Sequence, residues 1–363
     1  MKIPELKIGN YTANLPIVQG GMGVRISLSS LAAAVANEGG IGTISSIALG
    51  GVDASGREYE KISRDVLTEE IRRAKSLTSG PLAVNVMNVL TNAADLVKTS
   101  VQEGIKFIVM GAGLPMKLPY IVEDKDVNLI PIISSARAAS LILRTWDHRF
   151  NRTANAFILE GPLAGGHLGF SQDQLDHIDE FSLEKLLPAV LQAVRFYEDK
   201  YGAKIPIIVG GGIYDGKDIA RMLSLGASGV QMATRFVCTE ECSVSSEFKQ
   251  AYIDTKEEDI VIVKSPVGLL GRAIRNQFLK KLEETEKLKI KCRYKCLSAC
   301  QAAKAKYCIA KALFNSYLGD LDNGLIFCGK NAFRVDKITT VKEIFKELID
   351  DLGNALSLEL KPA

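Results

Sequence analysis

Short apolar runs rich in Val and Ile alternate along the chain with longer stretches in which apolar residues recur every three or four positions. A continuous apolar run is typical of a strand in a covered parallel sheet, and the longer recurrence is typical of an amphipathic helix. We therefore predict a repeating order of strand and helix. The predicted strands are Leu15–Gln19, Ile41–Ile44, Leu82–Val86, Phe107–Met110, Leu129–Ile133, Ala156–Leu159, Ile207–Val209 and Gly229–Met232. The predicted helices include Leu28–Glu38, Ser135–Trp146, Ser182–Lys200 and Asp218–Leu225, with N-caps at Ser27, Thr68 and Ser135.

Eight strands joined by helices indicate an α/β fold, the (β/α)8 TIM barrel. A doubly wound open sheet is the main alternative, but its glycine-rich phosphate loop usually follows the first strand. Here the clearest loop of that kind, Gly210–Gly212, follows the seventh predicted strand. We therefore expect a barrel over residues 1–263 and a C-terminal helical extension over 264–363. The extension is predicted to contain a long charged helix over Lys280–Gly319 and an amphipathic helix over Val341–Leu352.

The charge balance argues against a polyanionic partner. The 363 residues carry 45 Lys and Arg against 42 Asp and Glu, a formal charge of +3, which gives no electrostatic reason to expect nucleic acid. No apolar stretch approaches the roughly 18 residues of a membrane-spanning helix, and the polar start lacks the apolar core of a signal peptide. The seven cysteines are odd in number, which suits a reducing compartment. We therefore expect a cytoplasmic protein without a nucleic-acid or membrane partner.

Glycine-rich segments follow most of the predicted strands, at the end of the barrel where the chemistry of this fold is found. Glycine lets a ligand approach the backbone closely, or simply permits a tight turn with positive φ. Turn-making alone explains any single loop, but the recurrence at corresponding strand ends favours a shared ligand. The segments at these strand ends are Gln19–Gly23, Asn85–Asn88, Gly111–Gly113, Gly161–His167, Gly210–Gly212 and Gln231–Thr234.

The loops after the seventh and eighth strands form the usual phosphate site of this fold. Their backbone N–H groups can donate to a phosphate, at Gly211, Gly212, Ala233 and Thr234. A ring attached to that phosphate would lie over the barrel mouth. Gln19, Gly21, Met22, Gly23 and Asn85 come from the opposite side, where a flavin needs hydrogen-bond partners along its pyrimidine edge. Asn85 has an alternative role as the cap of the following helix.

His167 differs from the other two histidines in its setting. It ends the segment Ala164-Gly165-Gly166-His167 directly after the sixth predicted strand, in a loop too rich in glycine to need a histidine for packing. A neutral imidazole there can accept a carbon-bound proton or donate to a developing anion. No second histidine or carboxylate stands at metal-ligand spacing, so we expect no metal at this histidine.

Five segments together resemble the nitronate monooxygenase family, formerly called 2-nitropropane dioxygenases, within a superfamily of FMN-dependent TIM barrels. They are Gln19–Gly23, Asn85, Ala164–His167, Gly210–Ile213 and Gln231–Phe236. The resemblance runs over roughly residues 4–280. It implies a barrel that binds FMN non-covalently and a helical second part that closes over the barrel mouth.

The resemblance also implies a reaction and roles for residues. His167 would be the catalytic base for oxidation of an alkyl nitronate with O2, which yields a carbonyl compound and nitrite. The implied partners are therefore a small-molecule substrate and O2. The FMN contacts would fall on Met22, Asn85, Glu160, Gly165, Gly211, Gly212, Gln231, Met232, Ala233 and Thr234, and Gly166 lies in the same loop.

Two alternatives compete with nitronate oxidation. Leu163 stands where family members commonly carry Glu before Ala-Gly-Gly-His, which removes a polar partner of the histidine or the substrate. Similar loops also occur in flavin-dependent enoyl-ACP reductases and in NADH:quinone reductases, so an NAD(P)H-dependent reductase of an enoyl thioester or quinone is one alternative. A flavin-binding or redox-sensing protein without turnover is the other. Arg272 and Arg275 are candidate ligands of an anionic substrate group, although a surface salt bridge explains them equally well. The sequence does not indicate an oligomeric state.

Four of the cysteines gather at Cys292, Cys296, Cys300 and Cys308. On one continuous helix, spacings of four spread the first three over about 12 Å of the axis, so four thiols converge only if the helix breaks. We therefore interpret them as small buried residues on an inward stripe and expect no metal ligand set. A metal or iron–sulfur site and a redox-sensing role stay as alternatives, because neighbouring Lys and Arg residues would lower the pKa of an exposed thiol.

Overall fold

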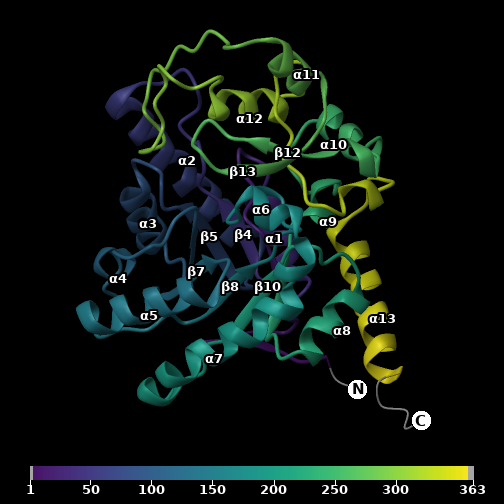
Figure 1. Cartoon of the computed structure of the whole chain (residues 1–363). Coiled ribbons are helices and arrows are strands. Elements are labelled where there is room, and N and C mark those ends of the chain that lie inside the picture. Colours follow the sequence, from purple (N-terminus) through teal and green to yellow (C-terminus); the bar gives the residue numbers. More distant parts are fainter. Residues whose placement is uncertain (1–2, 359–363) are drawn as a thin grey trace.

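Eight parallel strands form a barrel in the computed structural model, which describes residues 3–358 (Figure 1). Their order is β3-β11-β10-β8-β7-β6-β5-β4. The two edge strands are joined at Ile41, which pairs with Val18 and exchanges backbone hydrogen bonds of 2.9 Å with Ile17 and Gln19. The predicted fold class and all eight predicted strands are confirmed. The strands are β3 (Ile17–Gln19), β4 (Gly42–Ser45), β5 (Leu82–Met87), β6 (Phe107–Gly111), β7 (Asn128–Ile133), β8 (Phe157–Glu160), β10 (Ile207–Gly210) and β11 (Gly229–Met232).

Helices follow the strands and cover the outside of the barrel (Figure 1). Those of the barrel layer are α1 (Ser29–Asn37), α2 (Gly56–Leu77), α3 (Ala93–Gln102), α4 (Leu118–Ile121), α5 (Ala136–Phe150), α7 (Leu183–Tyr201) and α8 (Gly216–Ser224). The four predicted helices are confirmed as α1, α5, α7 and α8, with small shifts at their ends. Shorter helices follow the later strands, as α6 (Gln172–Asp176), α9 (Thr234–Val237) and α10 (Ser246–Ile253). No helix within residues 3–358 is both long and apolar enough to cross a membrane.

One of the three predicted N-caps is confirmed. The Ser135 hydroxyl accepts a hydrogen bond from the Ala138 backbone N–H at 3.3 Å, at the start of α5. Ser27 was the wrong residue for α1, which begins after Leu28, because the Ser27 hydroxyl is already used by the Met22 N–H at 3.0 Å. Thr68 lies inside α2, which starts a full twelve residues earlier at Gly56.

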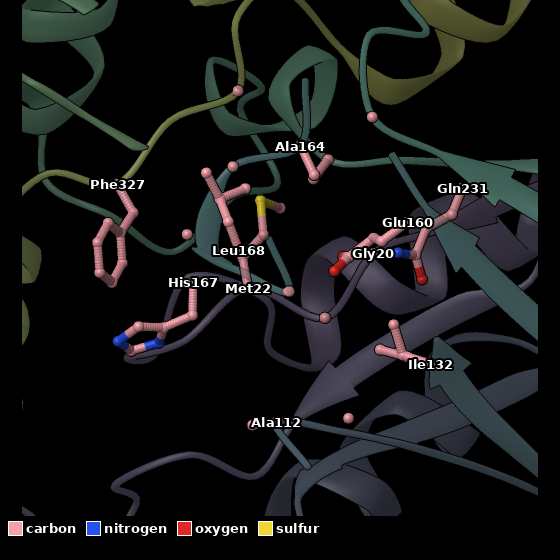
Figure 2. Close-up of a pocket in the computed structure, with 18 of the residues that line it drawn as sticks. Gly20, Met22, Ala112, Ile132, Glu160, Ala164, His167, Leu168, Gln231 and Phe327 are labelled. Carbon is pink, nitrogen blue, oxygen red and sulfur yellow. The ribbon is translucent and has the colours of Figure 1, made fainter. Parts of the chain in front are cut away.

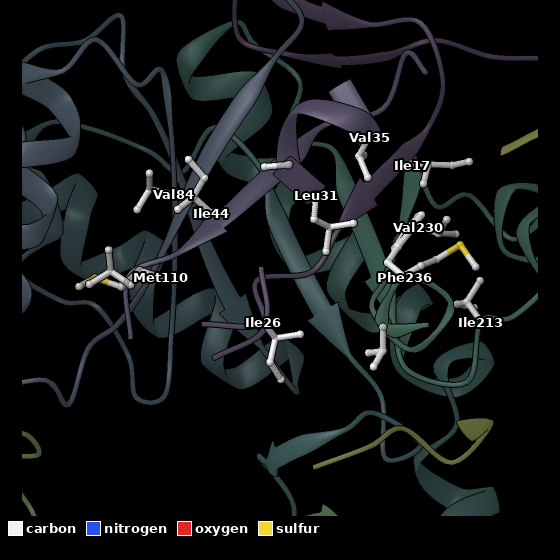
Figure 3. Close-up of a cluster of buried hydrophobic side chains, with 14 of the residues drawn as sticks. Ile17, Ile26, Leu31, Val35, Ile44, Val84, Met110, Ile213, Val230 and Phe236 are labelled. Atoms are coloured by element: carbon white, nitrogen blue, oxygen red, sulfur yellow. The ribbon is translucent and has the colours of Figure 1, made fainter. Parts of the chain in front are cut away.

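Two apolar layers hold the barrel together. Inward-facing side chains fill its interior, among them Val18, Ile41, Ala83 and Ile208. Outward-facing side chains pack against the helices, and part of this layer is shown in Figure 3 around Leu31, Val84 and Phe236. The strands are therefore apolar on both faces, which explains why their sequences are continuous apolar runs.

The amino-terminal hairpin closes one end of the barrel. It consists of β1 (Leu6–Ile8) and β2 (Tyr11–Ala13), paired antiparallel. Leu6, Ile8 and Ala13 belong to the same buried cluster as the interior side chains of the strands. The carboxyl ends of the strands are thus the end left for a ligand.

A small antiparallel sheet ties the later part of the chain to the barrel. It has the order β12-β13-β9, with β9 (Gly166–Leu168), β12 (Ile260–Lys264) and β13 (Leu270–Ile274). His167 on β9 pairs with Gly271 on β13. The predicted division at 263/264 falls inside β12, and the segment after it contributes a strand as well as α11 (Gln277–Glu284), α12 (Ile309–Tyr317) and α13 (Val341–Leu358).

The long helix predicted over Lys280–Gly319 was wrong. Helix α11 ends at Glu284, α12 begins at Ile309, and the residues between them have no regular helix. The cause is visible in the sequence, because from Lys287 to Cys296 cationic and uncharged residues alternate strictly. That period of two suits an extended chain, and the cations are exposed while most of the residues between them are half-buried. The other prediction for this region is confirmed, because the amphipathic helix expected over Val341–Leu352 is α13.

Candidate active site

A cavity of about 440 Å³ lies at the carboxyl ends of the barrel strands (Figure 2). Most predicted site residues line it. They are Gly21, Met22, Gly23, Asn85, Glu160, Gly165, Gly166, His167, Gly211, Gly212, Gln231, Met232, Ala233 and Thr234. Three predicted residues do not line it, and they are Gln19, Arg272 and Arg275. Figure 2 shows His167 and Phe327 on one side of the cavity, with Glu160 and Gln231 on the other.

The loops after β10 and β11 present unpaired backbone donors. The N–H groups of Gly211, Gly212, Ala233 and Thr234 find no acceptor within the part of the chain that the structure describes. Gly211 has φ of +100°, and a Cβ there would lie 2.9 Å from the Ala164 nitrogen. Gly212 has φ of +86°, and its Cβ would meet Leu163 at 2.9 Å. Only glycine therefore fits both positions, and the donors together form a cradle suited to an anion such as a phosphate.

Gln19 supports the loop beside the cavity instead of facing it. Its side-chain oxygen accepts a hydrogen bond from the Thr43 N–H at 2.9 Å, and its amide nitrogen donates to the Ser27 hydroxyl at 2.9 Å. The Ser27 hydroxyl also accepts from the Met22 N–H. Gln19 is fully buried, and this network fixes the backbone that places Met22 in the cavity wall.

Asn85 stands on β5, with its side chain at the cavity wall and 6% exposed. Its amide nitrogen approaches the Val109 carbonyl at 3.5 Å, a weak bond that leaves most of its hydrogen-bonding capacity for a ligand. The alternative role as a helix cap was wrong, because the N-cap of α3 is Asn92.

Glu160 brings a protonatable carboxyl to the cavity. It ends β8 and lies beside Gly210 of β10, opposite Gln231 of β11. Burial raises the pKa of its carboxyl to about 7, and no side-chain partner for it occurs within residues 3–358. A carboxyl in this state can serve as a hydrogen-bond donor as well as an acceptor near neutral pH.

His167 is held as a neutral imidazole. Its Nε2 lies 2.9 Å from the Ser265 hydroxyl, and the Phe327 ring meets the imidazole edge-on at 5.1 Å between centroids. Burial lowers the pKa of His167 to about 4. The Ser265 bond occupies Nε2, so Nδ1 is the ring nitrogen free to exchange a proton with a bound molecule.

The two arginines considered as substrate ligands have other partners. Arg272 is buried, and its guanidinium donates to the Ala164 carbonyl beneath the His167 loop. Arg275 is exposed and forms an ion pair of 3.0 Å with Glu283 of α11. Arg272 therefore supports the loop from behind, whereas Arg275 makes the surface salt bridge that was its alternative role.

Sequence reasoning missed the residues that the later part of the chain brings to the cavity. Phe327, Cys328 and Lys330 line it, and the Lys330 N–H donates to the Leu163 carbonyl at 3.1 Å. Burial raises the pKa of the Cys328 thiol to about 12, so it stays protonated. Ser265 carries no local sequence signal that links it to His167. Their approach depends on the β9–β13 pairing, which local sequence patterns do not specify.

An eight-stranded parallel barrel with a half-buried histidine and an anion cradle at its carboxyl end places the chain in the class of (β/α)8 barrels. The family model for nitronate monooxygenase matches residues 5–351, and the chain belongs to that family.

Known proteins similar to this chain carry several different names. A (3aS,4S,5R,7aS)-5-hydroxy-7a-methyl-1-oxo-octahydro-1H-indene-4-carboxyl-CoA dehydrogenase of Mycobacterium tuberculosis is 30% identical over 74% of the chain. The chain spans 65% of the length of that relative. A probable nitronate monooxygenase of Staphylococcus saprophyticus is 26% identical, over 78% of the chain and 82% of the relative. The structure of FabK from Thermotoga maritima superposes with a TM-score of 0.73 at 28% identity, covering 95% of this chain and 94% of that one.

Proposed function

We propose that the chain is an FMN-dependent nitronate monooxygenase. It would oxidise alkyl nitronates with O2 to a carbonyl compound and nitrite, with His167 as the base. The observation that carries the proposal is the neutral imidazole of His167, which shares one cavity with the cradle of unpaired backbone donors. The membership of the nitronate monooxygenase family supports it.

The cavity residues fit FMN by their chemistry. The N–H groups of Gly211, Gly212, Ala233 and Thr234 would hold its phosphate, because they have no acceptor within residues 3–358. Asn85 and Gln231 would provide amide partners for its ring, and Glu160 would provide a carboxyl that is neutral or charged near pH 7. When bound, FMN would supply the electron transfer between substrate and O2.

His167 would handle the proton. Its Nδ1 is free, and its lowered pKa keeps it unprotonated over the whole neutral range, so it can accept a proton from substrate carbon. Met22, Leu168 and Phe327 make the cavity walls near this histidine apolar. Ser265 would act as a positioning residue that fixes the ring orientation through Nε2.

The test is anaerobic mixing of FMN-loaded protein with propyl-2-nitronate, NADH or NADPH in separate experiments, with the flavin absorbance followed over time. We expect bleaching with the nitronate and none with either nicotinamide. In His167→Ala we expect turnover to fall by about 10²- to 10⁴-fold while FMN content is unchanged, since the loss of a general base has this magnitude. The matched control is His177→Ala, because His177 is exposed and lies outside the cavity.

Two results would contradict the proposal. If the purified protein holds no flavin and cannot be loaded with it, FMN is not its cofactor. A His167→Ala variant with full activity would show that His167 is not the base.

A second candidate is a nicotinamide-dependent reductase or dehydrogenase that acts on an acyl thioester. The observation in its favour is the name of the Mycobacterium relative, a carboxyl-CoA dehydrogenase, at 30% identity. Leu163 agrees with it, since its side chain makes the wall beside Gly212 apolar where family members commonly carry Glu. Bleaching by NADH or NADPH alone in the same mixing experiment would favour this candidate.

A further inference from the structure

Lys330 is the one lysine or arginine within residues 3–358 that lines the cavity. The cradle consists of backbone N–H groups, which carry no formal charge, and the same cavity also contains the carboxyl of Glu160. A phosphate that enters such a site gives up part of its hydration, and a nearby positive charge offsets that cost. Lys330 is therefore the candidate for this countercharge.

The backbone around Lys330 is fastened to both loops of the cradle. The side-chain amide of Asn331 donates to the Gly212 carbonyl at 2.8 Å, in the loop after β10. A Cβ at Gly329 would lie 2.6 Å from the Thr234 hydroxyl, so the chain passes directly against the loop after β11. Because Lys330 stands between these two contacts, its backbone is held next to the unpaired donors.

The Lys330 ammonium has a partner that it can exchange. It pairs with Glu257 of η2 (Glu257–Asp259), with 2.9 Å between Nζ and Oε1. The two side chains are 34% and 57% exposed, and an ion pair so open to solvent is weak. A phosphate offers more negative charge than one carboxylate, and a charged hydrogen bond to it is correspondingly stronger. The flexible four-carbon stem of lysine lets the ammonium change partners while the backbone stays fixed.

The charge of Lys330 acts on the cavity wall. Burial raises the pKa of the Cys328 thiol, and the positive charges of Arg272 and Lys330 oppose that rise. Arg272 cannot serve a ligand in the same way, because it is buried and donates to the Ala164 carbonyl behind the His167 loop. Lys330 is thus the nearby cation that is free to turn to a bound anion.

We propose that Lys330 is the charged ligand of the flavin phosphate, and that its ammonium leaves Glu257 for that phosphate when FMN binds. The inference rests on the FMN-dependent function proposed above and adds to it a residue from the carboxyl-terminal part of the chain. Its consequence is specificity, because riboflavin has the same ring as FMN but no phosphate. Glu257 is the competing anion that holds the ammonium until the phosphate displaces it.

The experiment titrates apoprotein with FMN and, separately, with riboflavin, and follows binding by flavin fluorescence. In Lys330→Ala we expect the FMN affinity to fall by about tenfold, since a charged hydrogen bond outweighs a surface ion pair by roughly this factor. The riboflavin affinity should stay within about twofold of wild type, because no phosphate contact is lost. Lys330→Arg keeps the positive charge and should retain most of the FMN affinity. Lys337→Ala is the matched control, because Lys337 is exposed and lies outside the cavity.

Glu257→Gln distinguishes an exchange of partners from a structural role of the ion pair. Removal of the competing carboxylate should leave the FMN affinity between equal to wild type and about fivefold higher, with the riboflavin affinity unchanged. If the ion pair only held the backbone around Lys330 in place, Glu257→Gln and Lys330→Ala would both weaken the binding of FMN and riboflavin. A lower FMN affinity in Glu257→Gln would therefore overturn the inference.

Two further results would also overturn it. Lys330→Ala could bind FMN as tightly as wild type, or it could lose the same factor of affinity for FMN and for riboflavin. In both cases wild type still binds FMN, so the function proposed above is not affected. If wild type binds neither flavin, the FMN-dependent function and this inference are both wrong.

Discussion

The loops at the carboxyl ends of the barrel strands, here called the rim, and residues 285–308, here called the cysteine segment, both carry conspicuous sequence patterns. Different physical constraints determine the structures of these two regions. At the rim, each loop follows a strand that pairs on both sides and is buried on both faces, so its position is fixed by the barrel. The cysteine segment contains no regular helix and is joined to the barrel layer by individual contacts, such as the pairing of Leu297 with Leu90 and the stacking of Tyr294 on Tyr59. A sequence pattern therefore predicts structure reliably where packing enforces it, and less so where local chemistry decides.

The strongest test of the rim is Gly211→Ala. The new Cβ would lie 2.9 Å from the Ala164 nitrogen and 3.0 Å from the Gly161 carbonyl, and φ would stay at +100°. Backbone strain of this kind costs about 1–3 kcal/mol, and because its relief moves the cradle donors we expect the FMN affinity to fall by about 5- to 150-fold. Titration of apoprotein with FMN measures it. Gly268→Ala is the control, since φ is +85° there but nothing lies near the Cβ, and equal FMN affinity in the two variants would contradict the cradle.

A pair of cavity-forming substitutions compares the two regions directly. Leu129→Ala on β7 should reduce the free energy of unfolding by about 2–5 kcal/mol, because Leu129 is fully buried in a wall that cannot collapse. Leu297 is also buried, at 5% exposed. Leu297→Ala should nevertheless reduce the free energy of unfolding by less, because the irregular segment around it can close the cavity that the substitution leaves. Urea unfolding measures both. Equal losses would mean that the cysteine segment is packed as rigidly as the barrel.

The success of the sequence at the rim has a physical basis. Apolar runs such as Ile207–Val209 could be assigned because two covered faces demand them, and their order implied the barrel. The glycine positions followed, since Gly211 is required by close backbone contacts and Gly212 by its positive φ beside the Leu163 side chain. Gln19 was misjudged because a buried amide at a strand end looks the same in sequence whether it faces a ligand or bonds to Thr43 and Ser27.

What the sequence missed depends on contacts between distant segments. Ser265 lies 98 residues from His167, and only the β9–β13 pairing brings the two together. Phe327 and Cys328 reach the cavity from still further along the chain. The alternation of cations from Lys287 to Lys295 was the available signal in the cysteine segment, and helical spacing of the cysteines concealed it.

The pH dependence of stability tests how the rim buries its titratable groups. The pKa of Glu160 is raised to about 7, so the folded chain binds more protons than the unfolded chain between about pH 4.5 and 7. The contribution of Glu160 to the free energy of unfolding is therefore fully present at low pH. It is lost as the pH rises through 7, and the total loss is up to about 3 kcal/mol. Burial lowers the pKa of His167 to about 4, which acts in the opposite direction between about pH 4 and 6.5.

The difference between wild type and Glu160→Gln isolates the carboxyl, since His167 is common to both. In urea unfolding experiments, we expect the free energy of unfolding of the variant to increase relative to that of wild type as the pH increases from 5 to 8. A difference that does not change with pH would mean that Glu160 ionises at its ordinary pKa, with a partner not found within the described residues.

The smallest effect is expected at Arg275, which lies between the two regions at the start of the segment leading to α11. Its ion pair with Glu283 joins side chains that are 47% and 60% exposed, and such pairs contribute roughly 0–1 kcal/mol. Arg275→Ala should therefore leave the melting temperature almost unchanged and the KM for propyl-2-nitronate within about twofold of wild type. Glu283→Ala removes the same ion pair, so its melting temperature and KM should equal those of Arg275→Ala. If Arg275→Ala raises KM tenfold and Glu283→Ala does not, the guanidinium of Arg275 binds substrate. The substrate site would then include a residue outside the cavity lining.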